Sequence, residues 1–147
     1  MPDFEALKLE NQLGFPLYAC AKEVVRLYTQ HLAPLDLTYT QYITLAALFE
    51  EETLSVKDLC ARLYLDTGTM TPLLKKLEQR KLLVRKRDYV DERRVHITIT
   101  DAGKALKTQA AAVQEAVDND IALSSTDAYL LYTLLYKTLN HLREMEG

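Results

Sequence analysis

The stretch from Leu54 to Thr100 constrains the fold of this chain more than any other part of it. It begins with a short amphipathic segment, SVKDLCARL, and continues through a turn into a second amphipathic segment, TGTMTPLLKKLEQ. Two runs with the alternation of strands follow, LLVRKR and RVHITIT, and they flank a charged turn, DYVDER. The order helix, turn, helix and β-hairpin predicts a winged helix-turn-helix unit.

Positive charge is concentrated in this same stretch. From Leu54 to Thr98 the chain carries 11 basic and 6 acidic residues, a net charge of +5, whereas the remainder carries 7 basic and 15 acidic residues, a net charge of −8. Neutralisation of phosphates depends on charge close to the groove, so the local excess matters more than the overall charge of −3. The segregation of charge predicts that the winged part binds double-stranded DNA.

Apolar residues recur at helical spacing on both sides of this unit. Pro16 suits the first position of a helix, and Ser55 suits an N-cap because Asp58 follows three residues later. The first expected helix begins after Gly14–Phe15–Pro16 and ends at Pro34, and the second runs from about Thr38 to Glu50. The third begins at Ser55, and the fourth contains TGTMTPLLKKLEQ. The fifth runs from Thr100 or Asp101 to about Val117, and the sixth begins at Ser125.

The last helix is more apolar than one contact face requires, because tyrosines at 129, 132 and 136 are added to its leucines. A second copy of the chain is the simplest partner, which gives a homodimer that presents two reading heads to a pseudo-palindromic operator. The predicted fold class is mainly α with a small β-hairpin: one domain over residues 1–147, with a winged helix-turn-helix at about 38–100 and dimerisation helices at about 9–34 and 101–147.

The second amphipathic segment is the expected recognition helix. Its core face is predicted to hold Met70, Leu73, Leu74 and Leu77. Pro72 leaves two alternatives open: the helix begins at Thr71–Pro72 with Thr71 as cap, or Asp66 is the cap and Pro72 follows a loosened first turn. The expected DNA contacts on this helix are Thr67, Gly68, Thr69, Thr71, Pro72, Lys75, Lys76 and Arg80. A solvated basic face is the alternative interpretation, and the basic hairpin that follows argues against it.

The hairpin supplies a second group of expected contacts: Arg85, Arg87, Asp91, Arg93 and Arg94. A guanidinium at the tip of the turn suits the narrow minor groove, where the negative potential is strongest. Asp91 is expected to hold the fork of Arg93 in a bidentate pair. The alternative is a charged turn that only contacts solvent.

LYLDTGTMTPLLKKLEQRKLLVRKR and DERRVHITITDAGK resemble the signature region of the MarR family of winged-helix regulators. The wing motif D-x-R of that family corresponds to Asp91 and Arg93. LENQLGFPLYA and LDLTYTQYITLAALFE are similar to the branch that contains the organic-hydroperoxide-sensing repressors (OhrR) and the MgrA and SarZ regulators. The resemblance implies a homodimer with interlocked terminal helices, recognition helices in successive major grooves, wings in the minor groove, and repression relieved by a small molecule or an oxidant.

The chain departs from that branch at the switch. The branch has a reactive cysteine in the motif L-C-F, where this chain has Leu13–Gly14–Phe15. The resemblance assigns Tyr18, Tyr28 and Tyr39 to the tyrosines around that thiol. Three hypotheses stay open: a small aromatic or apolar effector bound in a cleft lined by these tyrosines, an oxidant sensed through Cys20, and loss of the switch. Cys20 and Cys60 are both expected to be buried and unreactive.

Other classes of function find little support in the sequence. The three histidines lie far apart without metal-ligand spacing, and no phosphate-binding loop or nucleophile motif occurs, so no metal, cofactor or enzyme activity is expected. Two cysteines without regular spacing, no signal segment and no membrane-length apolar run indicate the cytoplasm. The main alternative to a DNA-binding regulator is a winged helix used for protein–protein assembly.

Overall fold

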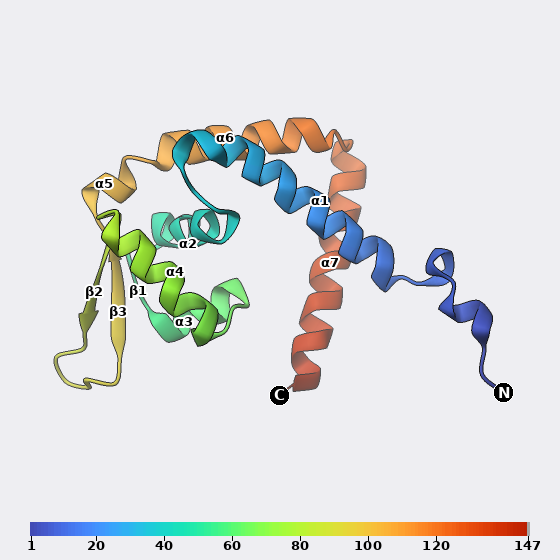
Figure 1. Ribbon diagram of the computed structural model, residues 1–147, viewed down its shortest axis with the longest axis horizontal. Helices are drawn as coiled ribbons and strands as arrows, with labels where there is room; N and C mark the ends of the chain where they lie inside the picture. Colours follow the sequence, from blue (N-terminus) through green and yellow to red (C-terminus); the bar gives the residue numbers. More distant parts are fainter. Residues whose placement is uncertain (147) are drawn as a thin grey trace.

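The computed structural model describes residues 1–146 of the chain. A winged helix-turn-helix unit lies at one end, α6 passes over the top, α1 packs on α6 and slopes away toward the N-terminus, and α7 descends beside the unit (Figure 1). Within residues 1–146 no helix is long and apolar enough to cross a membrane. The elements are η1 (Phe4–Leu7), η2 (Leu9–Asn11), α1 (Gly14–Leu32), η3 (Ala33–Leu35), α2 (Tyr39–Glu50), β1 (Thr53–Ser55), α3 (Val56–Leu63), α4 (Thr67–Gln79), β2 (Leu83–Arg87), β3 (Val95–Ile99), α5 (Asp101–Lys104), α6 (Lys107–Ile121) and α7 (Ser125–Glu146).

The predicted hairpin is part of a three-stranded antiparallel sheet with the order β1-β3-β2. β2 and β3 pair from Leu83 opposite Ile99 to Arg87 opposite Val95, and β1 adds three residues to the other edge of β3. The hydroxyl oxygens of Thr53 and Thr98 lie 2.9 Å apart across that edge. The sequence prediction missed β1, because a strand of three residues has no alternation to detect.

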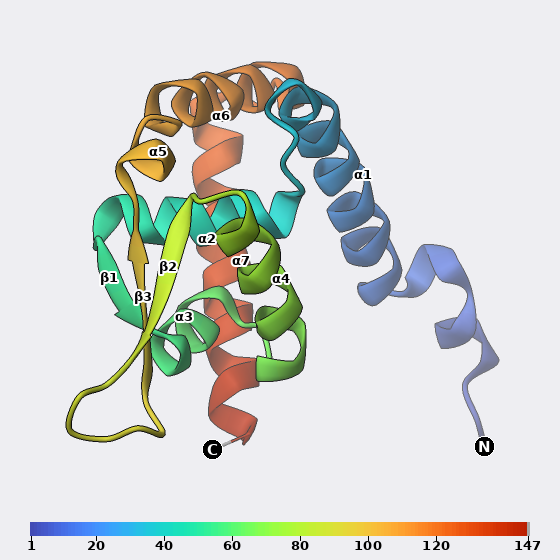
Figure 2. The ribbon, with the colours of Figure 1, turned by 60° about the vertical axis from the view of Figure 1, so that its left-hand side comes forward.

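The core lies between the sheet and helices α2, α3 and α4 (Figure 2). The face of α4 predicted to point inward is confirmed, since Met70, Leu73, Leu74 and Leu77 are all buried. They pack with buried residues from every neighbouring element, including Leu45, Leu48, Leu59, Leu83, Ile97 and Val117. α4 is therefore fixed along its apolar side, and its other side faces solvent.

The caps of the helices are local features, and most of them are confirmed. Thr38 caps α2 in a capping box that Gln41 completes, and Ser55 Oγ accepts from the Asp58 N–H at 3.0 Å. Asp66 Oδ1 accepts from the Thr69 N–H at 2.7 Å, so Asp66 is the cap of α4 and Pro72 lies inside that helix. The second alternative for Pro72 is thus the observed one. Because Pro72 has no N–H, the Gly68 carbonyl receives no helical hydrogen bond from it.

Two expectations about helix boundaries were wrong. α1 begins at Gly14, so Pro16 is its third residue rather than its first. The helix expected from Thr100 or Asp101 to about Val117 is two helices, α5 and α6, and of the two expected starts Asp101 is the first residue of α5, with Thr100 as its N-cap. The two short 3-10 turns before α1 were not predicted. Each of these boundaries depends on packing or backbone contacts that apolar spacing does not record.

Helices α1 and α7 leave much apolar surface exposed. α1 packs on α6, where His31 Nε2 lies 2.7 Å from Asp120 Oδ2. α7 touches the winged unit at Tyr64, whose ring lies 5.3 Å from the Arg143 guanidinium carbon. No residue of α7 is buried in the protomer, and its exposed apolar residues include Tyr129, Leu130, Leu131, Tyr132, Leu134, Leu135, Tyr136 and Leu142. A helix with this much exposed apolar surface requires a partner.

Replacing Ala122 by glycine is expected to stabilise the protein by about 1 kcal/mol, because a left-handed conformation disfavours any residue with a Cβ. Ala122 ends α6 with a φ of 59°. The free energy of unfolding in urea measures the effect. Ala112→Gly, in the exposed middle of the same helix, is the control and should lose about 1 kcal/mol. A loss of stability in both variants would contradict the prediction.

Candidate nucleic-acid interface

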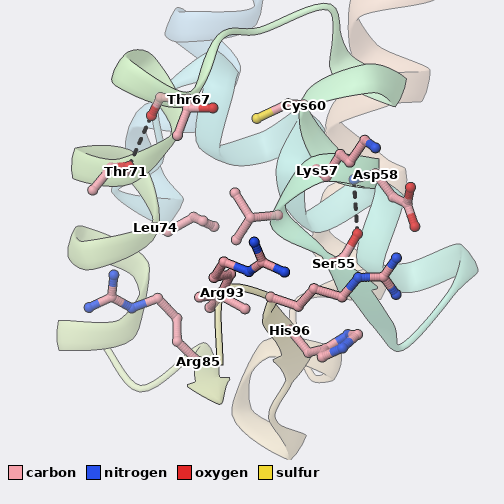
Figure 3. A pocket seen from close by; sticks show the side chains of 13 residues that line it. Ser55, Lys57, Asp58, Cys60, Thr67, Thr71, Leu74, Arg85, Arg93 and His96 are labelled. Carbon is pink, nitrogen blue, oxygen red and sulfur yellow. Dashed lines mark hydrogen bonds between the residues drawn. The ribbon is translucent and has the colours of Figure 1, made fainter. Parts of the chain in front are cut away.

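A concave surface of about 600 Å³ lies between α3, α4 and the hairpin (Figure 3). Thr67 and Thr71 of α4 form one side, and Lys57 and Cys60 of α3 form another. The Arg93 side chain lies between these two sides in Figure 3. The remaining lining residues are Ser55, Val56, Asp58, Leu74, Arg85, Arg94, Val95 and His96. The recognition helix and the wing therefore border one cationic hollow.

The N-terminal half of α4 presents small and polar side chains. Gly68, Thr69 and Pro72 are exposed, as expected for residues that approach bases. Thr71 Oγ1 donates to the Thr67 carbonyl at 2.9 Å. The Thr69 N–H, followed by the Thr69 hydroxyl, lowers the pKa of Asp66 by hydrogen bonding to its carboxylate. The Asp66 cap stays ionised and holds the first turn of α4 in place.

The predicted pairing of Asp91 with Arg93 is confirmed, but the pair is not bidentate. Asp91 Oδ1 accepts from the Arg93 backbone N–H at 3.1 Å and from Arg93 Nε at 3.2 Å. A single carboxylate oxygen therefore orients the side chain, and the two terminal nitrogens of the guanidinium remain available. The Arg93 side chain is 92% exposed in the protomer.

Asp88 fixes the backbone of the hairpin loop. Its Oδ1 accepts from the Val90 N–H at 2.8 Å, and its Oδ2 lies 3.1 Å from His96 Nε2. The Asp88 N–H donates to the Arg94 carbonyl at 2.7 Å, which closes the loop at its base. The Val90 N–H, followed by the His96 side chain, lowers the pKa of Asp88 through hydrogen bonding. An ionised carboxylate thus organises the loop that carries Arg93.

Several of the predicted basic contacts have partners within the protein. Arg85 Nε donates to Glu78 Oε1 at 3.1 Å, and Arg87 donates to the Glu92 carbonyl at 2.9 Å. Arg80 donates to the carbonyls of Leu35 and Asp36, so it joins the end of α4 to the turn after α1. Lys76 lines a different cavity, next to Thr29, Asp36 and Arg80. Lys75 and Arg94 are exposed, and Arg94 lines the concave surface.

Among the members of this surface that the sequence prediction missed are two that can carry positive charge, Lys57 and His96. Lys57 lies in the first turn of α3, where only its contribution to the local positive charge indicated a role. His96 alternates with the inward residues Val95 and Ile97 on β3. The strand pattern predicted that it points away from the core, but the pattern did not show that α3 lies opposite.

Comparison with known proteins fixes the family. Residues 26–110 match the family model for the transcriptional regulators SarA/Rot, which is more than half of the chain. The chain belongs to this family of MarR-type winged-helix regulators. It is 43% identical over 141 residues to the organic hydroperoxide resistance transcriptional regulator of Bacillus subtilis, with 96% of each chain covered. It is 44% identical over 120 residues to the HTH-type transcriptional regulator SarZ of Staphylococcus aureus, with 82% of this chain and 81% of SarZ covered.

The SarA/Rot-type fold is also that of a solved complex with DNA. Reduced AbfR bound to DNA, a protein of Staphylococcus epidermidis, matches with a TM-score of 0.76 and 33% identity, covering 94% of this chain and 96% of AbfR. The winged helix-turn-helix class predicted from the sequence is thereby confirmed, as is the resemblance to the MarR family.

Between its dimerisation helices and its winged unit, this MarR-type chain has a cluster of three aromatic rings. The Tyr28 centroid lies 4.8 Å from that of Tyr39 and 5.5 Å from that of Tyr42. The hydroxyls of Tyr28 and Tyr42 both donate to Gln114 Oε1, at 2.9 and 2.7 Å. The structure therefore joins α1, α2 and α6 at one point. The sequence analysis did not include Tyr42 among the tyrosines of this group.

Tyr18 does not belong to this cluster. It lies more than two turns before Tyr28 on the exposed face of α1, with Lys22 Nζ 5.3 Å from its ring centre. The three tyrosines proposed to line an effector pocket are thus divided: Tyr28 and Tyr39 pack together, and Tyr18 faces outward in the protomer.

Burial, followed by the nearby hydroxyls of Tyr28 and Tyr39, raises the pKa of Tyr42 to about 12. The folded state therefore holds this proton above pH 10, where the unfolded chain releases it, and stability from this group is lost as pH rises from about 10 to 12. We expect wild type to lose stability in this range by up to about 1.4 kcal/mol per pH unit more than Tyr42→Phe. Urea unfolding at several pH values tests this, and parallel curves would contradict it.

Both cysteines were expected to be buried, but Cys20 is exposed in the protomer and Cys60 is only partly buried. The expectation that Cys20 is buried was therefore wrong. Apolar residues on either side of Cys20 suggested burial, but α6 packs against a different face of α1. Cys60 packs against the core and also lines the concave surface.

Proposed function

We propose that the protein is a dimeric, sequence-specific DNA-binding transcriptional regulator that acts as a repressor in the cytoplasm and has no enzymatic activity. Helix α4 enters the major groove, and the β2–β3 loop reaches the adjacent minor groove. The observation that carries this proposal is the concave surface, since the polar face of α4 and the oriented Arg93 border the same cationic hollow.

The dimer follows from the apolar surface of α7, which a second copy would cover. A two-fold dimer places two α4 helices on one side, so its operator is a pseudo-palindrome with half-sites about one helical turn apart. The structural relative AbfR has been solved bound to DNA. The assignments of individual DNA-contacting residues, from Thr67 to Arg94, remain proposals that mutagenesis tests.

Binding to a duplex from the promoter region of its own gene, measured by anisotropy at several salt concentrations, tests the proposal. The affinity should fall steeply with salt, because each neutralised phosphate releases counterions. A protein that uses this surface for protein–protein assembly would show weak duplex binding without that slope. Sedimentation of the free protein should show a dimer, and a monomer would rule out the two-fold arrangement.

The signal that releases the repressor is proposed to be a small ligand, with an oxidant as the competing hypothesis. The Bacillus subtilis relative is named for organic hydroperoxide resistance. This chain has no sulfur at Gly14, where the resemblance places the reactive thiol. A ligand at the junction of α1, α2 and α6 would act on the contacts that join the dimerisation helices to α2.

Cys20→Ser is expected to leave the response to organic hydroperoxide unchanged. A sensing thiol needs a cation or a helix N-terminus beside it, whereas Cys20 lies in the middle of α1 and the nearby Lys22 is placed over Tyr18. Duplex release by cumene hydroperoxide is the measurement, with Cys60→Ser as the matched control. A response in wild type that Cys20→Ser abolishes would assign the sensor to Cys20.

Gly14→Cys tests the same hypothesis from the other side. A Cβ at this position meets no atom within 4 Å in the protomer, so the variant should fold. If the rest of the hydroperoxide-sensing site is retained in this chain, the Gly14→Cys variant should release the duplex when hydroperoxide is added. A variant that binds DNA but stays insensitive would show that the chain lacks more than the thiol.

A further inference from the structure

The loop at the tip of the β2–β3 hairpin, residues 88–94, carries two adjacent apolar side chains that nothing in residues 1–146 covers. Tyr89 and Val90 are 102% and 93% exposed. In Figure 2 the loop that carries them extends beyond every other part of the winged unit. Single exposed apolar residues are common on protein surfaces. An adjacent exposed pair on a wing that is proposed to bind DNA would lie against the duplex in the complex.

The loop holds these two side chains in a defined position. Asp88 Oδ1 accepts from the N–H of Val90, and also from that of Asp91 at 3.4 Å. Across the base of the loop, the Arg94 N–H donates to the Asp91 carbonyl at 2.9 Å. The backbone on both sides of Tyr89 is thereby fixed before DNA arrives, which lowers the entropy lost on binding.

Charged residues stand on both sides of this pair in the chain. Arg87 is held to the Glu92 carbonyl, and Arg93 is held to the Asp91 carboxylate. The hairpin therefore presents an apolar pair with Arg87 before it and Arg93 after it, while the two carboxylates next to the pair, Asp88 and Asp91, are bonded within the loop. That order matches a groove whose walls are the C–H surfaces of deoxyribose and whose rims are phosphates.

We propose that Tyr89 and Val90 pack into the DNA minor groove against the deoxyribose walls, beside the arginines of the wing. This inference rests on the proposed function, because it needs the wing to reach the duplex. A protein partner fits the tip less well, since two side chains offer far less than the roughly 1,200–2,000 Å² of a stable protein interface. The hairpin from Leu83 to Ile99 carries five basic and three acidic residues, a net charge of +2, which also favours a polyanion.

The chain has no tryptophan, so Tyr89→Trp creates a single fluorescent probe at the tip. Addition of the promoter duplex should shift its emission and protect it several-fold from acrylamide quenching. Leu123→Trp, at the turn between α6 and α7 and far from the wing in Figure 1, is the control and should not change. Protection that depends on protein concentration without DNA would assign the tip to a protein contact and overturn the proposal.

Affinity gives a second, independent readout. Tyr89→Ser with Val90→Ser should weaken duplex binding about tenfold without changing the salt dependence, because no phosphate contact is lost. Tyr89→Phe should bind as wild type, since the ring and not the hydroxyl makes the contact. Normal duplex binding by Tyr89→Trp with no protection of its indole from acrylamide would overturn the proposal and leave the proposed function intact. Failure of wild type to bind any duplex would instead reject the proposed function itself.

Discussion

Gly103→Ala is expected to destabilise the protein by about 3 kcal/mol, at the upper end of the usual range for an overpacked site. A Cβ at this position would lie 2.3 Å from the Leu82 carbonyl oxygen and 2.6 Å from Ile99 Cγ1. The Leu82 carbonyl cannot move away freely, because it accepts the Thr100 N–H at 3.0 Å. Gly103 is also held from its other side, since its N–H donates to the Thr100 hydroxyl that caps α5.

This site joins the wing sheet to the helices that lead into the dimer. An alanine there must displace either β3 or the start of α5, so we expect the midpoint of urea unfolding to fall clearly. Gly68→Ala is the matched control, because its Cβ would meet only Asp66 Oδ1, at 3.5 Å. That control should gain up to about 1 kcal/mol of helix stability. Equal midpoints for Gly103→Ala and wild type would show that the junction is looser than its geometry indicates.

Arg93→Ala should weaken operator binding by about 1–3 kcal/mol and reduce the salt slope by about one. Arg93 is the exposed arginine of the wing that Asp91 orients through two hydrogen bonds to one oxygen. Because Arg93 is exposed and lies outside the core, the variant should keep the dimer and the unfolding midpoint of wild type. Anisotropy titrations at several salt concentrations give both quantities.

Two control variants show whether DNA binding depends on the position of the Arg93 charge or only on the total positive charge of the protein. Arg26→Ala removes an exposed arginine of α1 that pairs only with Glu23 among residues 1–146, and duplex affinity should stay unchanged. Asp91→Asn keeps the charge of Arg93 but weakens its orientation, so the affinity should fall less than in Arg93→Ala and the salt slope should persist. An Arg93→Ala variant that binds like wild type would remove this arginine from the DNA-binding mechanism.

Much of the winged unit could be predicted because its signals are short in range. The caps at Thr38, Asp66 and Thr100 each bond to an N–H three residues later. The buried face of α4 follows from spacing of three and four residues. The pairing of Asp91 with Arg93 spans two residues. A pattern of this kind is complete within one segment, so no knowledge of neighbouring elements is needed.

The candidate site was predicted less completely, because sequence shows charge and not the partners of charge. Arg80 was expected at the DNA, but carbonyls 44 and 45 residues earlier in the chain bind its guanidinium. Arg85 was expected there too, and Glu78 accepts its Nε–H. Lys57 and His96 join the concave surface only because α3 and β3 face each other across it. Only the tertiary structure separates the basic residues that have partners within the protein from those that face the concave surface.

The sequence by itself determined the winged helix-turn-helix class, the inward face of α4 and the oriented arginine of the wing, since hydrogen bonds and apolar spacing within one segment specify them. Only the tertiary structure decided that β1 adds a strand, that α5 and α6 are separate helices, and that Tyr28 and Tyr42 meet at Gln114. That last contact spans 86 and 72 residues. Contacts between residues so far apart in the sequence depend on how whole helices and strands pack. The local sequence pattern of each element does not show which other element it packs against.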